Sequence, residues 1–495
     1  MKNLNNKYNF KNPVRHFFNI DKISFDGLTE LDVDCLSWTT PIPFKIYKTD
    51  NSERTIKFPN LLNFYHTLKV FESEPCFEKI EKMSNKKRVN PDLNTGEFSV
   101  LSYDKSIQSD FFNLVKYDKL LILDIKSFYG RIYLHDYNFP FDDKKEQRVG
   151  ALNLGRSNGL LLGNYLSLYL AEVYLKKIED ELDKEIKVSS LDCHYEYFSD
   201  DFYFFCYNKD IDKIKQIFSK VLDNYDLQVN NEKVEIIDFD DYSRKNNLDK
   251  LWKKIINISM EKDKKLSLNK HPSFFTQLNY RLSQIEDIKY KRVFLVNFFK
   301  TKYFYELDTK KYALSESDFN YICYIYKLMP ECILYSVDKV KNMGGFDYNK
   351  FRDFLEARYK SSLNFNRYEE QLYYYYAIKK CENDEMLIKY KKEVLNSENQ
   401  ILISYYLIDG IIQKEEYEID VSENKWLQNY HYLLKYDKDN INILIPKYAT
   451  KEKQKNSYRT FYKTNIDKNL SIVCPIDKLQ EQISNYLKKR IQAYN

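Results

Sequence analysis

The stretch YEYFSDDFYFF, residues 195–205, indicates the fold of the first half of the chain. Two aromatic runs that favour β-strands flank Ser199, Asp200 and Asp201, so the stretch predicts a β-hairpin with two carboxylates at its tip. Adjacent carboxylates offer the oxygen ligands that Mg²⁺ prefers. The alternative is a solvated acidic turn, because this is one of three Asp-Asp pairs in the chain.

A third carboxylate follows an apolar run upstream. The run LLIL, residues 120–123, has the pattern of a buried strand, and Asp124 ends it. A charge in this place is costly unless it is paired or bound to a metal, and the alternative is an acid that caps the following helix. Two-metal phosphoryl transfer needs acids from separate elements to hold ions roughly 4 Å apart. We therefore expect Asp124, Asp200 and Asp201 to form one site.

Composition indicates a large folded protein. The chain has 495 residues, of which 43% are hydrophobic and 16% aromatic, which excludes a disordered or collagen-like protein and favours several domains. The 78 Lys and Arg nearly balance the 73 Asp and Glu, so a surface for a polyanion must be local. The cysteines form no CxxC pair, and no signal peptide or membrane-spanning run is present. We expect a cytoplasmic protein with free thiols and no membrane partner.

Two regions differ in their predicted secondary structure, which indicates two domains. Residues 1–250 mix short β-like runs with helices, which is typical of an α+β domain. Residues 251–495 consist mostly of helical patterns separated by short polar turns. We expect an all-α domain there, with HEAT-like repeats as an architectural hypothesis because no fixed period is present.

Several motifs, in one order, resemble those of reverse transcriptases. The stretch DIKSFY from Asp124 resembles the first catalytic motif, and Phe198-Ser-Asp-Asp resembles the (Tyr/Phe)-x-Asp-Asp motif. Between them, SNGLLLGNYLS at 157–167 resembles the template-grip turn and helix. The resemblance spans residues 44–233 and implies the fingers and palm of that family, followed by the helical domain.

A narrower resemblance is to the abortive-infection (Abi) reverse transcriptases of bacterial phage defence, of the AbiK-like type. It rests on FYGRIYLHD from Phe128, on NGLLLGNYLS and on the LAEVYL that follows. The chain departs from the usual forms at Leu134, where IYTH has Thr, at Asn164, where Pro is usual, and at Phe198, where Tyr is commoner. No departure removes an acidic residue, so the departures concern the grip on template or primer.

The resemblance implies a role for each motif residue. Asp124 and Asp200 would bridge two Mg²⁺ ions, with Mn²⁺ as an alternative, and Asp201 would be a weaker or outer ligand. Tyr129 would lie beneath the sugar of the incoming nucleotide and exclude a 2′-hydroxyl; the alternative is core packing. Lys233 would donate a proton to the leaving pyrophosphate, and the alternative is a surface lysine.

Two further segments resemble nucleotide-binding parts of the same family. Two β-like runs joined by a polar turn resemble the fingertip hairpin, where Arg54 and Lys48 would bind the triphosphate; the alternative is a pair of solvated cations. Asn158 and Gly159 would allow close approach of a template base. The alternative is an ordinary helix N-terminus capped by Ser157 or Asn158.

The sequence thus predicts an enzyme, a DNA polymerase that uses dNTPs. The Abi resemblance implies a role in phage defence, untemplated synthesis primed from a protein hydroxyl, single-stranded DNA that becomes attached to the protein, and a homo-oligomer. One alternative is an RNA-templated retron or group II-like reverse transcriptase, although the chain has neither the retron Val-Thr-Gly nor a Cys/His nuclease segment. Another is a catalytically degenerate nucleic-acid-binding scaffold.

The helical region carries one more prediction. Four consecutive tyrosines at 373–376 are followed by Lys379 and Lys380. Aromatic faces beside cations suit single-stranded nucleic acid, so we predict that these helices guide the emerging product. The alternative is that the tyrosines pack helix against helix.

Overall fold

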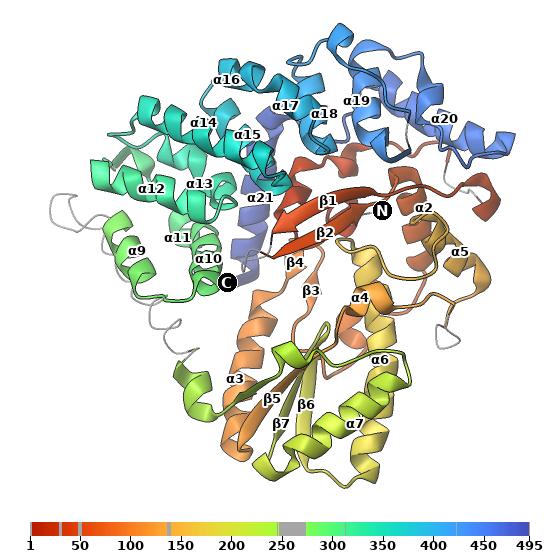
Figure 1. Ribbon diagram of the computed structural model, residues 1–495, viewed down its shortest axis with the longest axis vertical. Coiled ribbons are helices and arrows are strands. Elements are labelled where there is room, and N and C mark those ends of the chain that lie inside the picture. Colours follow the sequence, from red (N-terminus) through yellow and green to blue (C-terminus); the bar gives the residue numbers. More distant parts are fainter. Residues whose placement is uncertain are drawn as a thin grey trace.

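The structure is a computed structural model that describes residues 2–28, 32–47, 52–135, 140–244, 246, 274–311, 313–421 and 423–494. The chain is mixed α/β, with small sheets in its first half and a large helical region in its second (Figure 1). The predicted domain boundary at residue 250 lies outside the described residues.

A four-stranded antiparallel sheet forms the centre of the first half, with strand order β6-β7-β5-β8. The strands are β5 (Lys119–Asp124), β6 (Cys193–Phe198), β7 (Asp201–Cys206) and β8 (Glu235–Ile237). The hairpin predicted from residues 195–205 is confirmed, because Phe198 of β6 pairs with Asp201 of β7. The strand predicted at 120–123 is also confirmed, and it pairs with β7 on one side and β8 on the other.

Helices cover both faces of this sheet. α6 (Tyr165–Val188) and α7 (Ile211–Asp223) pack against each other on one face. α3 (Val100–Lys116) covers the other face through a separate core cluster that includes Leu120 and Phe205. Because successive strand residues point to opposite faces and both faces are buried, the strands read as nearly continuous apolar runs.

The hairpin that the sequence predicts at residues 44–59 is present, and it is called the fingertip hairpin after the resemblance. β1 (Ile42–Tyr47) and β2 (Glu53–Phe58) pair antiparallel, and Tyr47 lies opposite Glu53 at the turn end. The ring of Phe44 on β1 lies 5.5 Å from that of Tyr368, the first residue of α15. The hairpin therefore packs directly against the helical region.

The second half is helical, as predicted, and its neighbouring helices pack most extensively as the pairs α14–α15 and α18–α19. In Figure 1 these helices form an arc over β1 and β2. The helices of this half are α9 (Phe274–Ser283), α10 (Ile288–Phe299), α11 (Lys302–Tyr305), α12 (Glu316–Leu328), α13 (Cys332–Val340), α14 (Tyr348–Asn364), α15 (Tyr368–Lys380), α16 (Asp384–Lys389), α17 (Lys391–Leu395), α18 (Gln400–Ile408), α19 (Trp426–Tyr436), α20 (Glu452–Asp467) and α21 (Ile476–Tyr494). HEAT-like repeats stay a prediction.

The tyrosine run at 373–376 is buried inside this half. All four side chains are at most 4% exposed. The cations that follow are paired, Lys379 with Asp409 and Lys380 with Asp338, both at distances near 3 Å. The prediction that this run lies along a single-stranded DNA channel is therefore wrong, because its rings pack helix against helix and its cations are neutralised.

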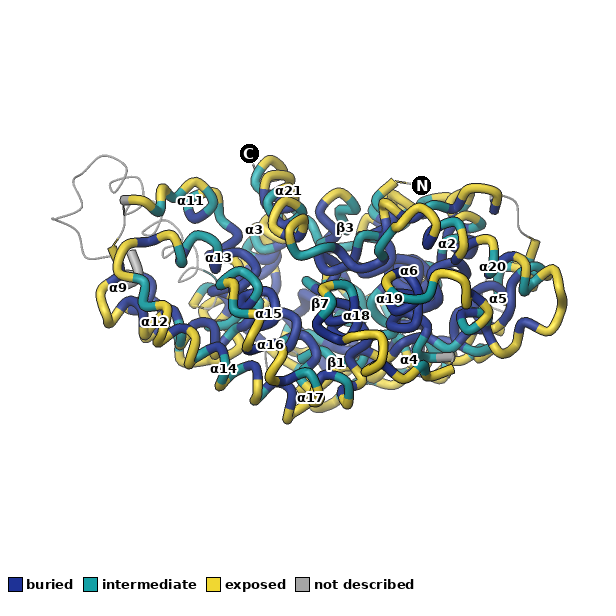
Figure 2. The backbone as a smooth tube through the Cα atoms, turned by 90° about the horizontal axis from the view of Figure 1, so that it is seen from above, coloured by how far each residue is buried: buried dark blue, intermediate teal, exposed yellow. Residues whose placement is uncertain are grey.

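Segments from the first and last parts of the sequence meet in the core. Phe18 forms a β-bridge with Val473, and the backbone N–H of Cys474 donates to the carbonyl of Phe17 at 2.8 Å. α21 follows directly and packs against α3 and the N-terminal segment. One hydrophobic core consequently runs through both halves, and Figure 2 shows its buried residues along the middle of the molecule.

Two sequence expectations concern the setting of the protein. Within the ranges given above, no helix has the length and apolar content needed to span a lipid bilayer. All eight cysteines are free thiols, and Cys206, Cys332 and Cys474 are buried.

Candidate active site

Three aspartates gather at one end of the central sheet. Asp124 is the last residue of β5 and is buried, and Asp201, the first residue of β7, lies directly opposite it in the ladder. Asp200 lies in the turn before β7, where its carbonyl accepts the backbone N–H of Ile125 at 3.0 Å. The two motifs that the sequence singled out are thus brought together by strand pairing.

The turn that carries Asp200 has an unusual backbone. Ser199 adopts a left-handed conformation with φ 55°. Left-handed residues other than glycine cost free energy and are found preferentially at functional sites. Burial raises the pKa of Tyr129, which lies on the short helix α4 (Phe128–Arg131), and Ser199 and Asp200 of the turn are near enough to affect it as well. The structure therefore places the predicted sugar-selecting tyrosine, which is partly buried, beside the acidic turn.

Asp124 is held by two polar side chains from the segment before β8. Lys233 Nζ lies 2.6 Å from Asp124 Oδ2, and Asn230 Nδ2 donates to Asp124 Oδ1 at 2.8 Å. The backbone N–H of Asn230 also donates to the Asp124 carbonyl at 2.8 Å. The sequence predicted Lys233 near the site but missed Asn230, whose place in the LQVNNEK stretch was its only signal.

The acids outnumber the cations in this cluster. Burial and the charges of Asp200 and Asp124 raise the pKa of Asp201 to about 7, although Lys233 acts in the opposite direction. Partial burial lowers the pKa of Lys233, but the hydrogen bond to Asp124 and the three aspartates outweigh it, so the net shift is upward. The carboxylates thus repel one another and one ammonium only partly offsets that repulsion.

The donor chemistry of the cluster fits a divalent cation. Carboxylate oxygens are the ligands that Mg²⁺ takes, and their mutual repulsion is what a bound cation relieves. Among the residues that the structure describes, however, no group of three or more His, Cys, Asp or Glu side chains is arranged to hold a metal ion. Lys233 and Asn230 occupy both oxygens of Asp124. The Mg²⁺ ligands named from the sequence stay a prediction.

The fingertip hairpin lies on the turn that precedes α6. The backbone N–H of Lys57 on β2 donates to the carbonyl of Leu162 at 3.0 Å. Gly163 has φ +108°, and a Cβ there would lie 3.0 Å from Ile56 Cβ. Arg54, two residues before Ile56, is exposed on the same strand. Lys48, its predicted partner, lies outside the described residues.

The predicted template turn is also close to α4. Gly159 has φ +79°, its N–H donates to the carbonyl of Ile132 at 2.9 Å, and a Cβ would lie 3.3 Å from the carbonyl oxygen of Gly130. Asn158 is exposed and forms a β-bridge with Tyr133. The tight approach of two backbones explains the glycine at 159.

The helix after this turn begins later than the sequence indicated. Asn164, not Ser157 or Asn158, is its N-cap, because Asn164 Oδ1 accepts the backbone N–H of Ser167 at 2.8 Å. An Asn side chain at this position satisfies a free N–H of the first helical turn. The Asn that departs from the Abi pattern thus has a structural role.

One cation near the acids was missed entirely. Lys11, in the N-terminal segment, has its Nζ 5.3 Å from the centroid of the Phe98 ring and 5.8 Å from that of Phe198. Phe198 is the residue before the acidic turn. Because Lys11 lies in a stretch rich in Asn and Lys, its sequence context did not indicate that it would lie near the acidic turn.

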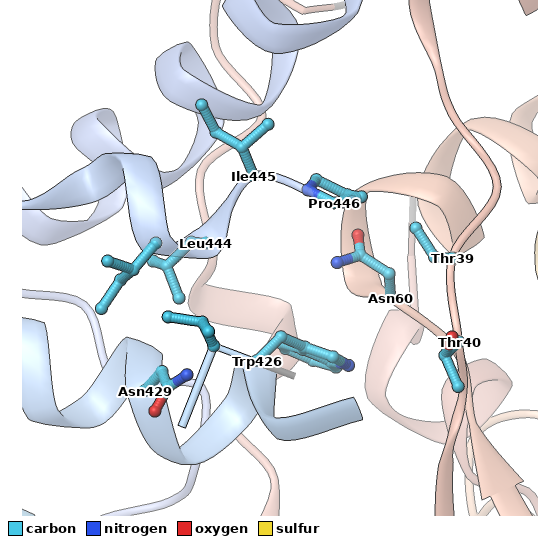
Figure 3. Close-up of a pocket in the computed structure, with 10 residues that line it drawn as sticks. Thr39, Thr40, Asn60, Trp426, Asn429, Leu444, Ile445 and Pro446 are labelled. Carbon is cyan, nitrogen blue, oxygen red and sulfur yellow. The ribbon is translucent and has the colours of Figure 1, made fainter. Parts of the chain in front are cut away.

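A small pocket between the two halves lies apart from these residues (Figure 3). Thr39, Thr40 and Asn60 line it from the first half, and Trp426 and Leu444 are among those that line it from the second. Its volume of about 20 Å³ fits about one water molecule. None of the residues that line the pocket is acidic or basic, so it offers no group for phosphoryl transfer.

Comparisons with known proteins give no family for the chain. No family model matches it, and a search of curated proteins finds no match. Among solved structures, it is similar to telomerase from Candida albicans in complex with a TWJ fragment of telomeric RNA, with a TM-score of 0.30 and 13% identity. The match covers 78% of this chain and 66% of that chain, which is less than two thirds of the telomerase. A likeness of this size supports no conclusion about function.

Proposed function

We propose that the protein is a DNA polymerase of the reverse transcriptase type, which transfers nucleotides from dNTPs. The observation that carries the proposal is the pairing of Asp124 with Asp201 across β5 and β7, with Asp200 in the left-handed turn between β6 and β7. Two acidic motifs far apart in the sequence thereby meet at one sheet end, as nucleotidyl transfer requires.

The residues around the acids supply the remaining roles. Two Mg²⁺ ions, or Mn²⁺, held by Asp124, Asp200 and Asp201, would stabilise the charge on the attacking and leaving oxygens. Lys233 Nζ lies beside Asp124 and would donate a proton to the leaving pyrophosphate, although its raised pKa makes it a weaker acid than a free lysine. Tyr129, beside the acidic turn, would exclude a ribonucleotide 2′-hydroxyl.

The nucleotide and the template would be bound by the two neighbouring turns. Arg54 and Lys48 on the fingertip hairpin would bind the triphosphate. Asn158 and Gly159 would lie against a template base, since the backbone there carries little side chain.

The Abi motifs support a finer version of this proposal. It comprises untemplated synthesis primed from a protein hydroxyl, a single-stranded DNA product attached to the protein, a homo-oligomeric enzyme and a role in phage defence. The support is the order of motifs between Phe128 and Leu175, and none of the three departures noted above removes an acidic residue.

The test is incorporation of labelled dNTPs by the purified full chain in Mg²⁺, with and without added RNA or DNA template. We expect incorporation without template, with label that stays on the protein in a denaturing gel. Asp124→Asn and Asp200→Asn should each lower incorporation at least about a thousandfold. Asp240→Asn, in another Asp-Asp pair and exposed, is the matched control and should be as active as the native chain.

The outcomes separate the alternatives. Incorporation that requires RNA template, with free product, would favour the retron or group II type. Near-native incorporation by both Asp variants would exclude this site, and no incorporation by the native chain under any condition would favour a scaffold protein.

A further inference from the structure

Two cationic side chains approach the acid cluster from different elements. On β2, Arg54 shares a strand face with Ile56 and Phe58, because alternate strand residues point the same way. Ile56 and Phe58 are buried, so this face is turned toward the protein. Lys11 reaches the same region from the N-terminal segment, next to Phe198.

Three consecutive residues hold the N-terminal segment in place. Phe10 donates its backbone N–H to the carbonyl of Gly163 at 2.8 Å, and Lys11 donates its own to the carbonyl of Gly96 at 2.6 Å. Asn12 donates from Nδ2 to a carboxylate of α15 at 2.9 Å. Lys11 itself is left-handed, with φ 69°, a strained conformation for a residue with a side chain. The backbone thus fixes where the Lys11 side chain begins.

The Lys11 side chain lies against two aromatic rings. It is exposed to solvent, and its ammonium lies near the rings of Phe98 and Phe198. The pKa of Lys11 is nevertheless lowered, mainly by burial and to a smaller extent by the positive charge of Arg54. The acids that oppose this shift are Glu97, Asp200 and Asp201.

Within the described part of the chain, neither Lys11 nor Arg54 forms an ion pair with a carboxylate. By contrast, Lys233 is paired with Asp124 and Arg15 with Glu97. Two like charges that approach each other without a counter-ion repel, and an anion with several charged oxygens between them relieves that repulsion.

We propose that Lys11 and Arg54 together form a two-cation subsite for the triphosphate of the incoming nucleotide. The inference rests on the proposed polymerase function and deepens it, because it gives the N-terminal segment a part in substrate binding. Phe198, over which the Lys11 ammonium lies, comes two residues before Asp200, so a polyphosphate bound to Lys11 would be close to the acids.

The test measures binding of inorganic tripolyphosphate to the full chain in Mg²⁺ by calorimetry. Lys11→Met keeps the length of the side chain over the two rings but removes the charge. We expect it to weaken binding about tenfold to a hundredfold, as for loss of one charge-assisted hydrogen bond. Lys11→Arg should restore most of the affinity. Lys22→Met, at an exposed lysine of the same segment, is the matched control and should bind as the native chain does.

Three further experiments test the same subsite. Lys11→Gly removes the charge and relieves the left-handed strain, so it should fold at least as well as the native chain and lose the same affinity. In the incorporation assay, Lys11→Met should raise the KM for dNTPs more than it lowers kcat. The double variant Lys11→Met with Arg54→Met should lose less than the product of the two single losses, because both cations act on one ligand.

The outcomes distinguish this inference from the polymerase proposal. If the charge-free Lys11 variants bind tripolyphosphate and dNTPs as the native chain does, Lys11 is no part of the subsite, whatever the activity. If binding depends on Lys11 but the native chain incorporates no nucleotide, the subsite stands and the polymerase proposal fails.

Discussion

The carboxylate of Glu369, in the first turn of α15, accepts the backbone N–H of Tyr47, the last residue of β1, at 3.0 Å. Its other oxygen accepts Asn12 Nδ2 at 2.9 Å, one residue after Lys11. A buried acid of the helical half thus holds both the fingertip hairpin and the N-terminal segment. The helical half is in this way coupled to the groups proposed to bind nucleotide.

Glu369 predicts a pH dependence of stability. Burial raises its pKa to about 7, against the opposing bonds from Tyr47 and Asn12 and with help from the charges of Glu331 and Glu370. Since the folded pKa is raised, its stabilising contribution is present below the unfolded value near 4.5 and is lost as pH rises through about 7.

The variant Glu369→Gln isolates this titration. From pH 5 to pH 8, the free energy of unfolding of the native chain should fall relative to that of Glu369→Gln by about 1–3 kcal/mol. Urea unfolding of both proteins at both pH values measures this difference. The loss of one acceptor oxygen in Glu369→Gln lowers the free energy of unfolding equally at both pH values, so it does not affect the comparison. A difference between the two proteins that does not change with pH contradicts the prediction.

Gly163→Ala should disturb the fingertip hairpin. The left-handed φ of +108° and the 3.0 Å approach to Ile56 mean that a methyl group both strains the backbone and displaces β2. We expect a loss of about 1–3 kcal/mol in the free energy of unfolding and a raised KM for dNTPs. Gly130→Ala is the control, since nothing lies within 4 Å of its Cβ position and its φ is ordinary. Equal effects of the two variants argue against this account.

Tyr129→Ala should increase ribonucleotide use relative to deoxynucleotide use. The ring lies near enough to the acidic turn for Ser199 and Asp200 to affect its hydroxyl, so its removal opens space for a 2′-hydroxyl. The ratio of kcat/KM for the two substrates is the measurement. Tyr129→Phe keeps the ring and should keep the selection. If Tyr129→Ala affects both substrates equally, the tyrosine is a packing residue.

Glu97→Gln should destabilise the contact between the two halves. Glu97 lies 3.1 Å from Arg15, 3.1 Å from Lys300 and 3.6 Å from Arg490, all largely buried cations. Although burial alone would raise the pKa of Glu97, these cations hold it well below its usual range. Removing the charge deprives the buried Arg15 of its ion-pair partner and leaves Lys300 with Glu331 alone, which costs about 3–5 kcal/mol of unfolding free energy.

The control for this variant is an exposed pair. Glu452 forms an ion pair with Arg459, and its side chain is 66% exposed. Because exposed pairs contribute little, Glu452→Gln should change the unfolding free energy by less than about 1 kcal/mol. Thermal and urea unfolding compare the two variants, and equal small effects would show that the Glu97 network is not stabilising.

The sequence predicted those parts of the site that depend on local pattern. Aromatic and apolar runs predicted both hairpins and the strand before Asp124, since β-pairing of short runs follows from residue type and turn chemistry. Lys11 and Glu369 were missed because their roles arise only from contacts between residues distant in sequence. The tyrosine run at 373–376 led to a wrong prediction. The same residue pattern suits tyrosines that pack between helices and tyrosines that stack on nucleic-acid bases, and only the tertiary structure decides which side of a helix is covered.

The contact between residues 17–18 and residues 472–474 has a consequence for synthesis on the ribosome. Phe17 and Phe18 are fully buried, and residues 472–474 supply their backbone partners. Since translation proceeds from the N-terminus, this segment obtains these backbone partners only after residues 472–474 have left the exit tunnel. A chain that stops before residue 472 therefore leaves the Phe17–Phe18 segment without these backbone partners.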